Sequence, residues 1–170
     1  AALLPGSECT VRRGTGDWLG YTAEELFAST LVPVCTPALA ADLLHPDDLC
    51  TATLIVVSHL RDQWRWWFDA AGLPAAVQPA NEVIFESSVM AMQAVLDGVG
   101  VAIAQLPYVS DALMSGRLVT PFPITSRRYE GWYLAYRPPQ EGDPALVVFR
   151  DWLRGEAESQ RQAHERLMPA

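Results

Sequence analysis

The chain contains no lysine, and all twelve of its basic residues are arginine, against twenty aspartates and glutamates. Arginine together with abundant alanine indicates codon bias in a GC-rich genome rather than a function. The formal net charge is −8, and the only adjacent arginines are Arg12-Arg13 and Arg127-Arg128. Non-specific binding to nucleic acid needs a basic face that neutralises phosphates. The sequence therefore excludes a chain that grips a phosphate backbone on its own.

Long hydrophobic runs are also missing. No run of about 18 uninterrupted apolar residues occurs, which predicts that no segment spans a membrane. Residues 1–8 lack the basic region of a secretory signal, so we expect a cytoplasmic location and no membrane partner. Half of the 170 residues are apolar and 19% are charged, which is typical of one globular domain or two small lobes.

Cysteine and histidine are scarce. Cys9, Cys35 and Cys50 are an odd number without C-x-x-C spacing, which suits a reducing cytoplasm better than a disulfide framework. The histidines form no metal-ligand pattern, and no G-x-S-x-G, P-loop or H-E-x-x-H motif is present. No pair of carboxylates shows the desolvation that acid–base catalysis needs. We therefore expect no metal, no other cofactor and no enzyme activity.

The most informative segment of the chain is 83–104, which predicts a strand, a helix, a glycine turn and a second strand. Ser87 and Ser88 open the helix, where unpaired backbone N–H groups favour a polar or anionic ligand. Gly98 suits a positive φ after the helix, and Gly100 permits close helix–strand packing. The apolar run 101–104 predicts a strand buried on both faces. Such a βαβ unit is typical of a binding site.

Strands and helices alternate along the whole chain, which predicts an α/β layer structure with a largely parallel sheet. Pro33 supplies no N–H, so its strand should lie at an edge or at a transition between sheets. Residues from Ser159 onward are polar and should fray. The other predicted strands are 9–13, 31–35, 53–58, 117–122 and 132–136, and the predicted helices are a short one beginning at Thr36-Pro37, 61–71, a short one around 111–114, and 144–157.

Six motifs follow one another over nearly the whole chain, and together they resemble the effector-binding domain of LysR-type transcriptional regulators. The similarity is greatest to the GcvA/AmpR-like branch, which includes regulators of glycine cleavage and of β-lactamase. The motifs are Leu31-Val32-Pro33-Val34-Cys35-Thr36-Pro37, Trp64-x-x-Trp67, Phe85-Glu86-Ser87-Ser88, Gly98-Val99-Gly100-Val101-Ala102, Gly116-Arg117-Leu118-Val119-x-Pro121-Phe122 and Phe149-Arg150-Asp151-Trp152-Leu153.

The resemblance implies a periplasmic-binding-protein-like (type II) α/β fold, in which two lobes hold a small ligand in the cleft between them. Against the family pattern, the second lobe is complete and the first lobe is truncated. The implied parts are 1–32 (part of lobe I and the first crossover, Thr30 to Val34), 33–119 (a Rossmann-like lobe II), 120–158 (the return to lobe I after a second crossover, Leu118 to Phe122) and 159–170 (a polar C-terminal tail).

On the lobe II side, the implied ligand-binding residues are Phe85, Glu86, Ser87 and Ser88. The β-lactamase branch usually has Asp where this chain has Glu86, and the longer side chain could fill part of the pocket. The residues alone leave other interpretations open. The two serines could serve only as N-caps, and Phe85 is better explained as a core residue than as a platform for a ligand.

On the lobe I side, the implied ligand-binding residues are Arg13, Gly14 and Tyr133. Strand alternation allows only one of Trp132 and Tyr133 to face the cleft, and Tyr133 is preferred for its hydroxyl donor. Arg13 could equally be a solvated surface charge.

The tryptophans of segment 61–71 suggest a carbohydrate-binding surface, but a structural role explains them better. Trp64 and Trp67 have the spacing of core residues on one helix face, and Trp66 is expected at the surface or in an interface.

The implied function is that of a ligand-sensing regulatory domain that modulates DNA-dependent transcription. Its effector would be a cell-wall fragment or another small metabolite. The family implies a homodimer or tetramer through the effector domains, and contact with DNA only through a helix-turn-helix that is absent from this chain. Two other classes stay open, namely a stand-alone solute-binding protein of the same fold and an enzyme built on an α/β fold.

Overall fold

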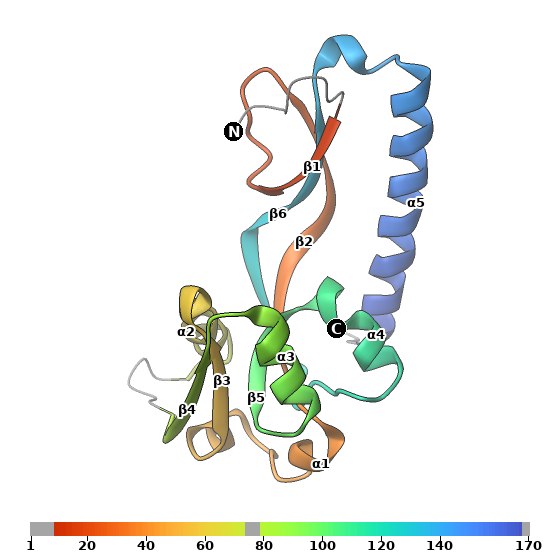
Figure 1. The fold of residues 1–170 in the computed structure, drawn as a ribbon. Coiled ribbons are helices and arrows are strands. Elements are labelled where there is room, and N and C mark those ends of the chain that lie inside the picture. Colours follow the sequence, from red (N-terminus) through yellow and green to blue (C-terminus); the bar gives the residue numbers. More distant parts are fainter. Residues whose placement is uncertain (1–8, 74–78, 168–170) are drawn as a thin grey trace. The chain divides into compact units, whose positions relative to one another are not determined.

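The computed structural model describes residues 9–73 and 79–167, which divide into two compact units. Unit 1 combines residues 9–29 with residues 127–166, and unit 2 holds residues 30–126. The strand β2 (Thr22–Val34) belongs to both units, because the boundary follows Ser29 (Figure 1). Within the described ranges, every helix is too short or too polar to cross a bilayer.

Unit 2 contains the part β2-β5-β3-β4 of a six-stranded sheet. Strand β3 (Thr53–Val57) runs parallel to both β4 (Asn81–Phe85) and β5 (Val101–Gln105). Residues 31–34 of β2 pair antiparallel with β5, so the sheet is mixed rather than largely parallel. β2 is not an edge strand, because it lies between β5 and β6 (Ser126–Tyr136) in the strand order, so the edge position predicted from Pro33 is wrong. Pro33 lies in the part of β2 that pairs with β5, just beyond the boundary between the two units.

Helices cover both faces of the unit 2 sheet. α3 (Ser88–Leu96) and α4 (Leu106–Met114) pack on one face with Val95, Val109 and other apolar side chains. α2 (Asp62–Ala70) packs on the other face with Trp64, Trp67 and Phe68, which confirms the predicted core role of the two tryptophans. The remaining helical segments of this unit are α1 (Pro37–Ala40) and the 3-10 turns Pro46–Cys50 and Ser58–Leu60.

The predicted βαβ unit is present, from β4 through α3 to β5. Gly98 has φ of +76°, as predicted for the residue that follows the helix. Residues of β5 are largely buried, as expected of a strand covered on both faces. A Cβ added to Gly100 would lie 2.3 Å from the carbonyl oxygen of Thr53, so the close approach is to strand β3 rather than to a helix.

Segment 117–122 is not a strand, and the prediction for it is wrong. Only Val119 forms a bridge, with Cys35, through N–H···O bonds of 2.8 and 3.1 Å. Pro121 and Pro123 supply no N–H group, so a longer ladder cannot form. The apolar residues of the segment serve the core instead, because Leu118 packs beneath α3 and α4 while Phe122 stacks near Trp67.

Unit 1 contains β1 (Cys9–Gly14), β6 (Ser126–Tyr136) and the first part of β2, with β6 in the middle. β1 and β6 are antiparallel, with Cys9 opposite Tyr136 and Gly14 opposite Gly131. The long helix α5 (Pro144–Leu167) follows a 3-10 turn, Pro138–Gln140. Its side chains at Leu146, Leu153 and Ala157 pack with Leu26, Leu134 and Tyr136 to form the core of this unit.

α5 extends to Leu167, beyond its predicted end at Ala157. Its last turns are rich in Glu, Gln, Arg and Ala, which are good helix formers even without burial. Glu158 adds an ion pair to Arg161 at 2.8 Å and accepts a hydrogen bond from Gln162 at 3.2 Å. Polarity alone is therefore a poor signal for fraying here.

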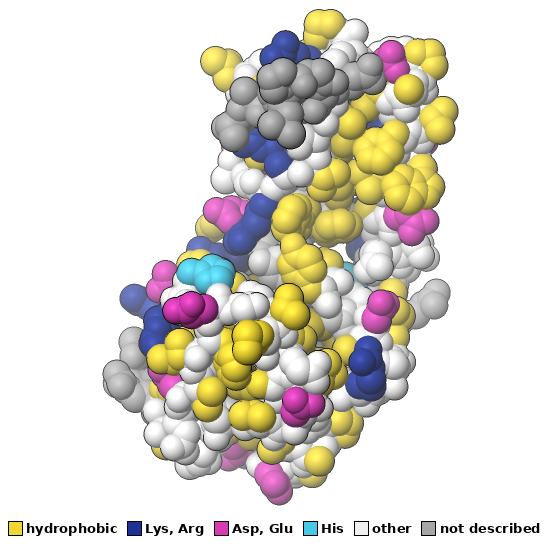
Figure 2. Space-filling view, in the orientation of Figure 1, with side chains coloured by type: hydrophobic (Ala, Val, Ile, Leu, Met, Phe, Trp, Pro, Cys, Tyr) yellow, Lys and Arg dark blue, Asp and Glu magenta, His cyan; other side chains and the backbone are white. Residues whose placement is uncertain are grey.

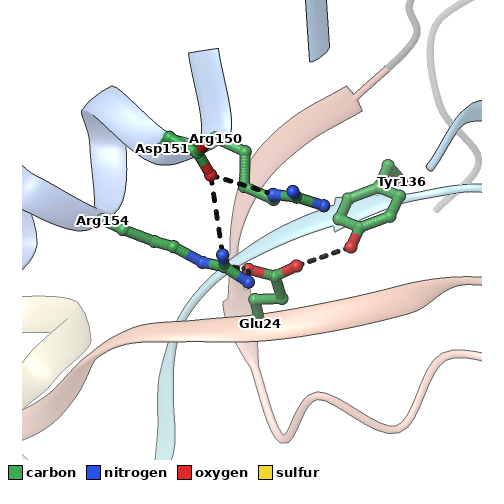
Figure 3. A network of polar contacts seen from close by, with 5 residues as sticks. All are labelled: Glu24, Tyr136, Arg150, Asp151 and Arg154. Carbon is green, nitrogen blue, oxygen red and sulfur yellow. Dashed lines mark hydrogen bonds and ion pairs between the residues drawn. The ribbon is translucent and has the colours of Figure 1, made fainter. Parts of the chain in front are cut away.

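A polar network joins the three elements of the unit 1 core (Figure 3). Glu24 of β2 accepts a hydrogen bond from the Tyr136 hydroxyl at 2.5 Å and pairs with Arg154 at 2.6 Å. Asp151 links Arg154 to Arg150, with N···O distances of 3.6 and 3.4 Å. Burial, followed by the hydrogen bond to Glu24, raises the pKa of Tyr136, so its hydroxyl stays a donor at neutral pH.

Candidate ligand-binding site

The N-terminus of α3 presents the predicted serine pair. Ser87 has extended backbone angles and its carbonyl accepts the Ala91 N–H at 3.0 Å, but its side chain makes no capping bond. Neither the Ser87 nor the Ser88 hydroxyl has a hydrogen-bond partner among the described residues. Ser87 thus occupies the N-cap position without using its hydroxyl there, which leaves both hydroxyls available to a ligand.

A pocket of about 580 Å³ adjoins this helix and lies wholly within unit 2. Its walls include Val57 and Gln105, the last residues of the parallel strands β3 and β5, and several α3 residues between Ser88 and Leu96. The carboxyl ends of parallel strands are where ligands bind in open α/β sheets. The pocket therefore lies where the βαβ pattern predicts a binding site.

Of the four residues predicted on this side, Ser88 is the one that lines the pocket. Phe85 is half-buried and packs against the core beneath α3, which supports its interpretation as a core residue. Glu86 is exposed and Ser87 is half-buried, and both lie beside the pocket in the sequence without lining it. The structure thus brings one predicted residue into the pocket and leaves the other three at its margin.

The pocket wall is mostly apolar, with five polar side chains. These are Gln63, Ser88, Gln93, Gln105 and Tyr108. Sequence reasoning missed the glutamines. Gln105 carries a usable signal, because it is a polar residue at the end of a buried strand. Gln63 has none, since an isolated glutamine between tryptophans and charged residues belongs to no motif.

Trp64 of α2 is part of the pocket wall and is fixed by its own contacts. The indole Nε1 of Trp64 donates a buried hydrogen bond to the Ile55 carbonyl at 3.1 Å. The same indole packs edge-on against Trp67, with ring centroids 6.5 Å apart. Figure 2 shows the face of unit 2 that carries α3, where several hydrophobic side chains lie at the surface.

The three residues predicted in unit 1 do not share one face of its sheet. Arg13 lies opposite Trp132, whereas Tyr133 lies opposite Arg12. Directly opposed residues point to the same face and neighbouring residues point to opposite faces, so Arg13 and Tyr133 are separated by the sheet. Arg13 pairs instead with Glu130 at 2.8 Å, and this pair is partly exposed. The geometry favours the solvated-charge interpretation of Arg13.

Tyr133 and Gly14 belong to a small aromatic cluster around Trp18. The Tyr133 ring meets Trp18 edge-on at 5.7 Å, and the Arg12 guanidinium lies 4.1 Å from the Trp18 ring centroid. A Cβ at Gly14 would lie 2.6 Å from the Trp18 ring, so the glycine makes room for this packing. Burial, followed by the charges of Glu25 and Asp17, raises the pKa of Tyr133 and keeps its hydroxyl protonated.

Comparison with known proteins relates the chain to transcriptional regulators. The sequence model of the LysR substrate binding domain matches residues 2–158. The HTH-type transcriptional activator AmpR of Rhodobacter capsulatus is 36% identical over 157 residues, which cover 91% of this chain and 52% of the relative. The glycine cleavage system transcriptional activator of Escherichia coli K12 is 32% identical over 152 residues, which cover 88% and 49%. The chain spans about half the length of these curated relatives.

Solved structures show the same similarity. The effector domain of AmpR from Pseudomonas aeruginosa superposes with a TM-score of 0.73 at 32% identity, covering 96% of this chain and 77% of that one. The AmpR effector binding domain from Citrobacter freundii gives a TM-score of 0.68 at 30% identity, covering 91% and 76%.

Proposed function

The chain belongs to the LysR substrate-binding domain family, and we propose that it is the effector-sensing part of a bacterial transcriptional regulator. The observation that carries the proposal is the pocket beside the N-terminus of α3, at the carboxyl ends of β3 and β5. A small effector binds there and acts by its different affinity for two arrangements of the protein. The chain itself carries out no chemistry.

The proposal extends to the predicted serine pair. Ser87 and Ser88 contribute hydroxyls and helix N–H groups to the effector. The complete regulator is a homo-oligomer that contacts DNA through a segment outside this chain. A protein that acts on transcription in bacteria works in the cytoplasm, so this location is part of the proposal.

The two alternative functions fit less well. The relatives at 32–36% identity are transcriptional regulators, which favours a regulator over a stand-alone solute-binding protein. An enzyme that uses acid–base chemistry most often has a carboxylate, an amine or an imidazole in its pocket, and none of the described residues that line this one is Asp, Glu, Lys, Arg or His.

The proposal is tested by mapping where the complete gene product binds the chromosome. We expect chromatin immunoprecipitation of the tagged protein, expressed from its own locus, to enrich a small set of promoters. Deletion of the gene should change transcription from the same promoters. Enrichment no greater than in an untagged strain would show that the chain does not serve a DNA-binding regulator.

The serine pair is tested in the same strain. Replacing Ser87 and Ser88 together by alanine should leave promoter occupancy intact and abolish at least nine-tenths of the effector-dependent change in transcription. Ser115→Ala is the matched control, because this hydroxyl already donates to the Ala112 carbonyl at 3.2 Å and lies away from the pocket. A double variant that responds as the control does would remove the serines from the site.

A further inference from the structure

We propose that the unit 2 pocket selects an uncharged ligand, one that buries an apolar group and presents a neutral amide to Gln63 and Gln105. The inference rests on the proposed function for its biological meaning, but it concerns the chemistry of the pocket and can fail independently. It follows from three features of the wall, namely its lack of charge, its unpartnered amides and its small apolar side chains.

The first feature is the lack of charge. The polar residues among those described as lining the pocket are three glutamines, one serine and one tyrosine, and no Asp, Glu, Lys, Arg or His joins them. A carboxylate, phosphate or ammonium group that left water for this pocket would find no side chain of opposite charge among these residues. Burial of an uncompensated charge is strongly unfavourable, whereas a neutral amide needs only hydrogen bonds.

The second feature is the pair of unpartnered amides. Gln63 near the start of α2 is 6% exposed, and its side-chain amide makes no hydrogen bond among the described residues. Gln105 at the end of β5 has a buried Oε1 that also lacks a partner there. Buried polar groups in folded proteins are almost always paired. Because a primary amide both donates and accepts, these two side chains match a ligand that does the same.

Gln93, the third glutamine of the wall, differs from the other two because its amide already has a partner. The Nε2 of Gln93 donates to Asp97 Oδ1 at 2.9 Å on the exposed side of α3. Its amide is therefore already paired within the helix. All three glutamines line the same pocket. Gln93 is exposed and its amide is paired, whereas Gln63 and Gln105 are less exposed and their amides make no pair with another described residue.

The third feature is the space left by small apolar side chains. Ala91 of α3 and Ala102 and Ala104 of β5 line the pocket where larger residues would fill it. Met92 and Leu96 complete this wall, and methionine adapts readily to ligands of different shape. The volume of about 580 Å³ lies within the range of small-molecule sites. The wall thus offers room for a phenyl or branched alkyl group.

The proposal is tested with three probes that share one hydrocarbon skeleton: N-acetylphenylalaninamide, which is neutral, N-acetylphenylalanine, which is an anion, and phenylalaninamide, which is a cation near pH 6. Each is titrated into the ¹⁵N-labelled chain and followed by NMR. We expect the neutral probe to shift amide signals of α3 and β5 and to bind at least tenfold more tightly than either charged probe. Equal binding of all three, preference for a charged probe, or no binding of the neutral probe overturns the proposal.

Variants assign the selectivity to named side chains. Gln63→Leu and Gln105→Leu should each weaken binding of the neutral probe at least fivefold, whereas Gln93→Leu should leave it unchanged. The first two variants should unfold at the same or a higher denaturant concentration than the parent chain, because an amide without a protein partner is replaced by an apolar group. If either variant is less stable, its amide has a structural partner and the assignment is wrong.

The outcomes separate this inference from the proposed function. Selective binding of the neutral probe by a protein that occupies no promoter would keep the pocket assignment and remove the regulatory function. The opposite result is also possible. If the protein occupies promoters and its effector response depends on the serine pair, but the pocket binds all three probes equally, the regulatory function would stand and the pocket assignment would fall.

Discussion

At the scale of single residues, burial determines which reactive groups can act. Cys35 is fully buried where β2 meets Val119, and burial raises the pKa of its thiol to about 11. The thiolate is the reactive form of cysteine, so this side chain is inert at neutral pH. Cys9 and Cys50 are partly exposed and are the accessible thiols of the described chain.

The Cys35 thiol should make stability depend on pH. Its ordinary pKa of 9.0 applies to the unfolded chain, and the folded value is about 11, so the native state holds the proton more tightly. This contribution is complete below pH 9 and is lost as the pH rises from 9 to 11. We expect urea unfolding of Cys35→Ala to show a shallower fall in stability over this range than the parent chain. Cys50→Ala is the control, and a Cys35→Ala variant that keeps the full slope would contradict the assignment.

At the scale of helices and strands, two glycines have opposite roles. Gly100 precedes β5, where any Cβ would lie 2.3 Å from the backbone oxygen of Thr53. Gly155 lies inside α5 with open space around the position of a Cβ. The first glycine is required by a close approach of two strands, whereas the second lowers the stability of an exposed helix.

Alanine at these two positions should therefore change stability in opposite directions. Gly155→Ala should raise the free energy of unfolding by about 0.5–1 kcal/mol, the usual difference in helix propensity. Gly100→Ala should lower it by about 1–3 kcal/mol, as overpacking against backbone does. Chemical denaturation of both variants measures the two effects, and a neutral Gly100→Ala would show that β3 and β5 can separate slightly without cost.

Elements whose signal is local were predicted well. The segment 83–104 has its strands, helix and positive-φ glycine in adjacent residues, and each is present. Segment 117–122 has the apolar pattern of a strand, but its backbone partners are fixed by distant residues and interrupted by prolines. For the candidate site, the serine at the start of α3 could be predicted because helix termini have a sequence signature. Gln63 could not, since only folding places it beside β3 and β5.

At the scale of the whole molecule, composition and family agree. The net charge of −8 and an isoelectric point near 4.7 disfavour binding to a phosphate backbone. The chain covers about half of relatives that are transcriptional regulators. Binding to DNA in the proposed regulator therefore has to come from residues outside this chain.

This division of labour predicts that the chain alone does not bind DNA. In fluorescence anisotropy with a labelled duplex of random sequence, we expect a Kd weaker than about 10⁻⁴ M, even at low salt where non-specific binding is strongest. The complete gene product should bind the same duplex more tightly, with the steep salt dependence of phosphate contacts. Micromolar binding by the chain alone would contradict the charge argument.

The shared strand β2 has a consequence for the order in which the protein forms on the ribosome. Strand β1 and the first half of β2 are synthesised first, yet the strand that lies between them, β6, begins only at Ser126. Unit 2 is one continuous stretch, residues 30–126, and its strands can pair before β6 has left the exit tunnel. During that interval β1 and the first half of β2 have no β6 between them, and unpaired strand edges are where nascent chains aggregate. Strand β1 and the first half of β2 are thus the strands that wait longest for their partner in the sheet.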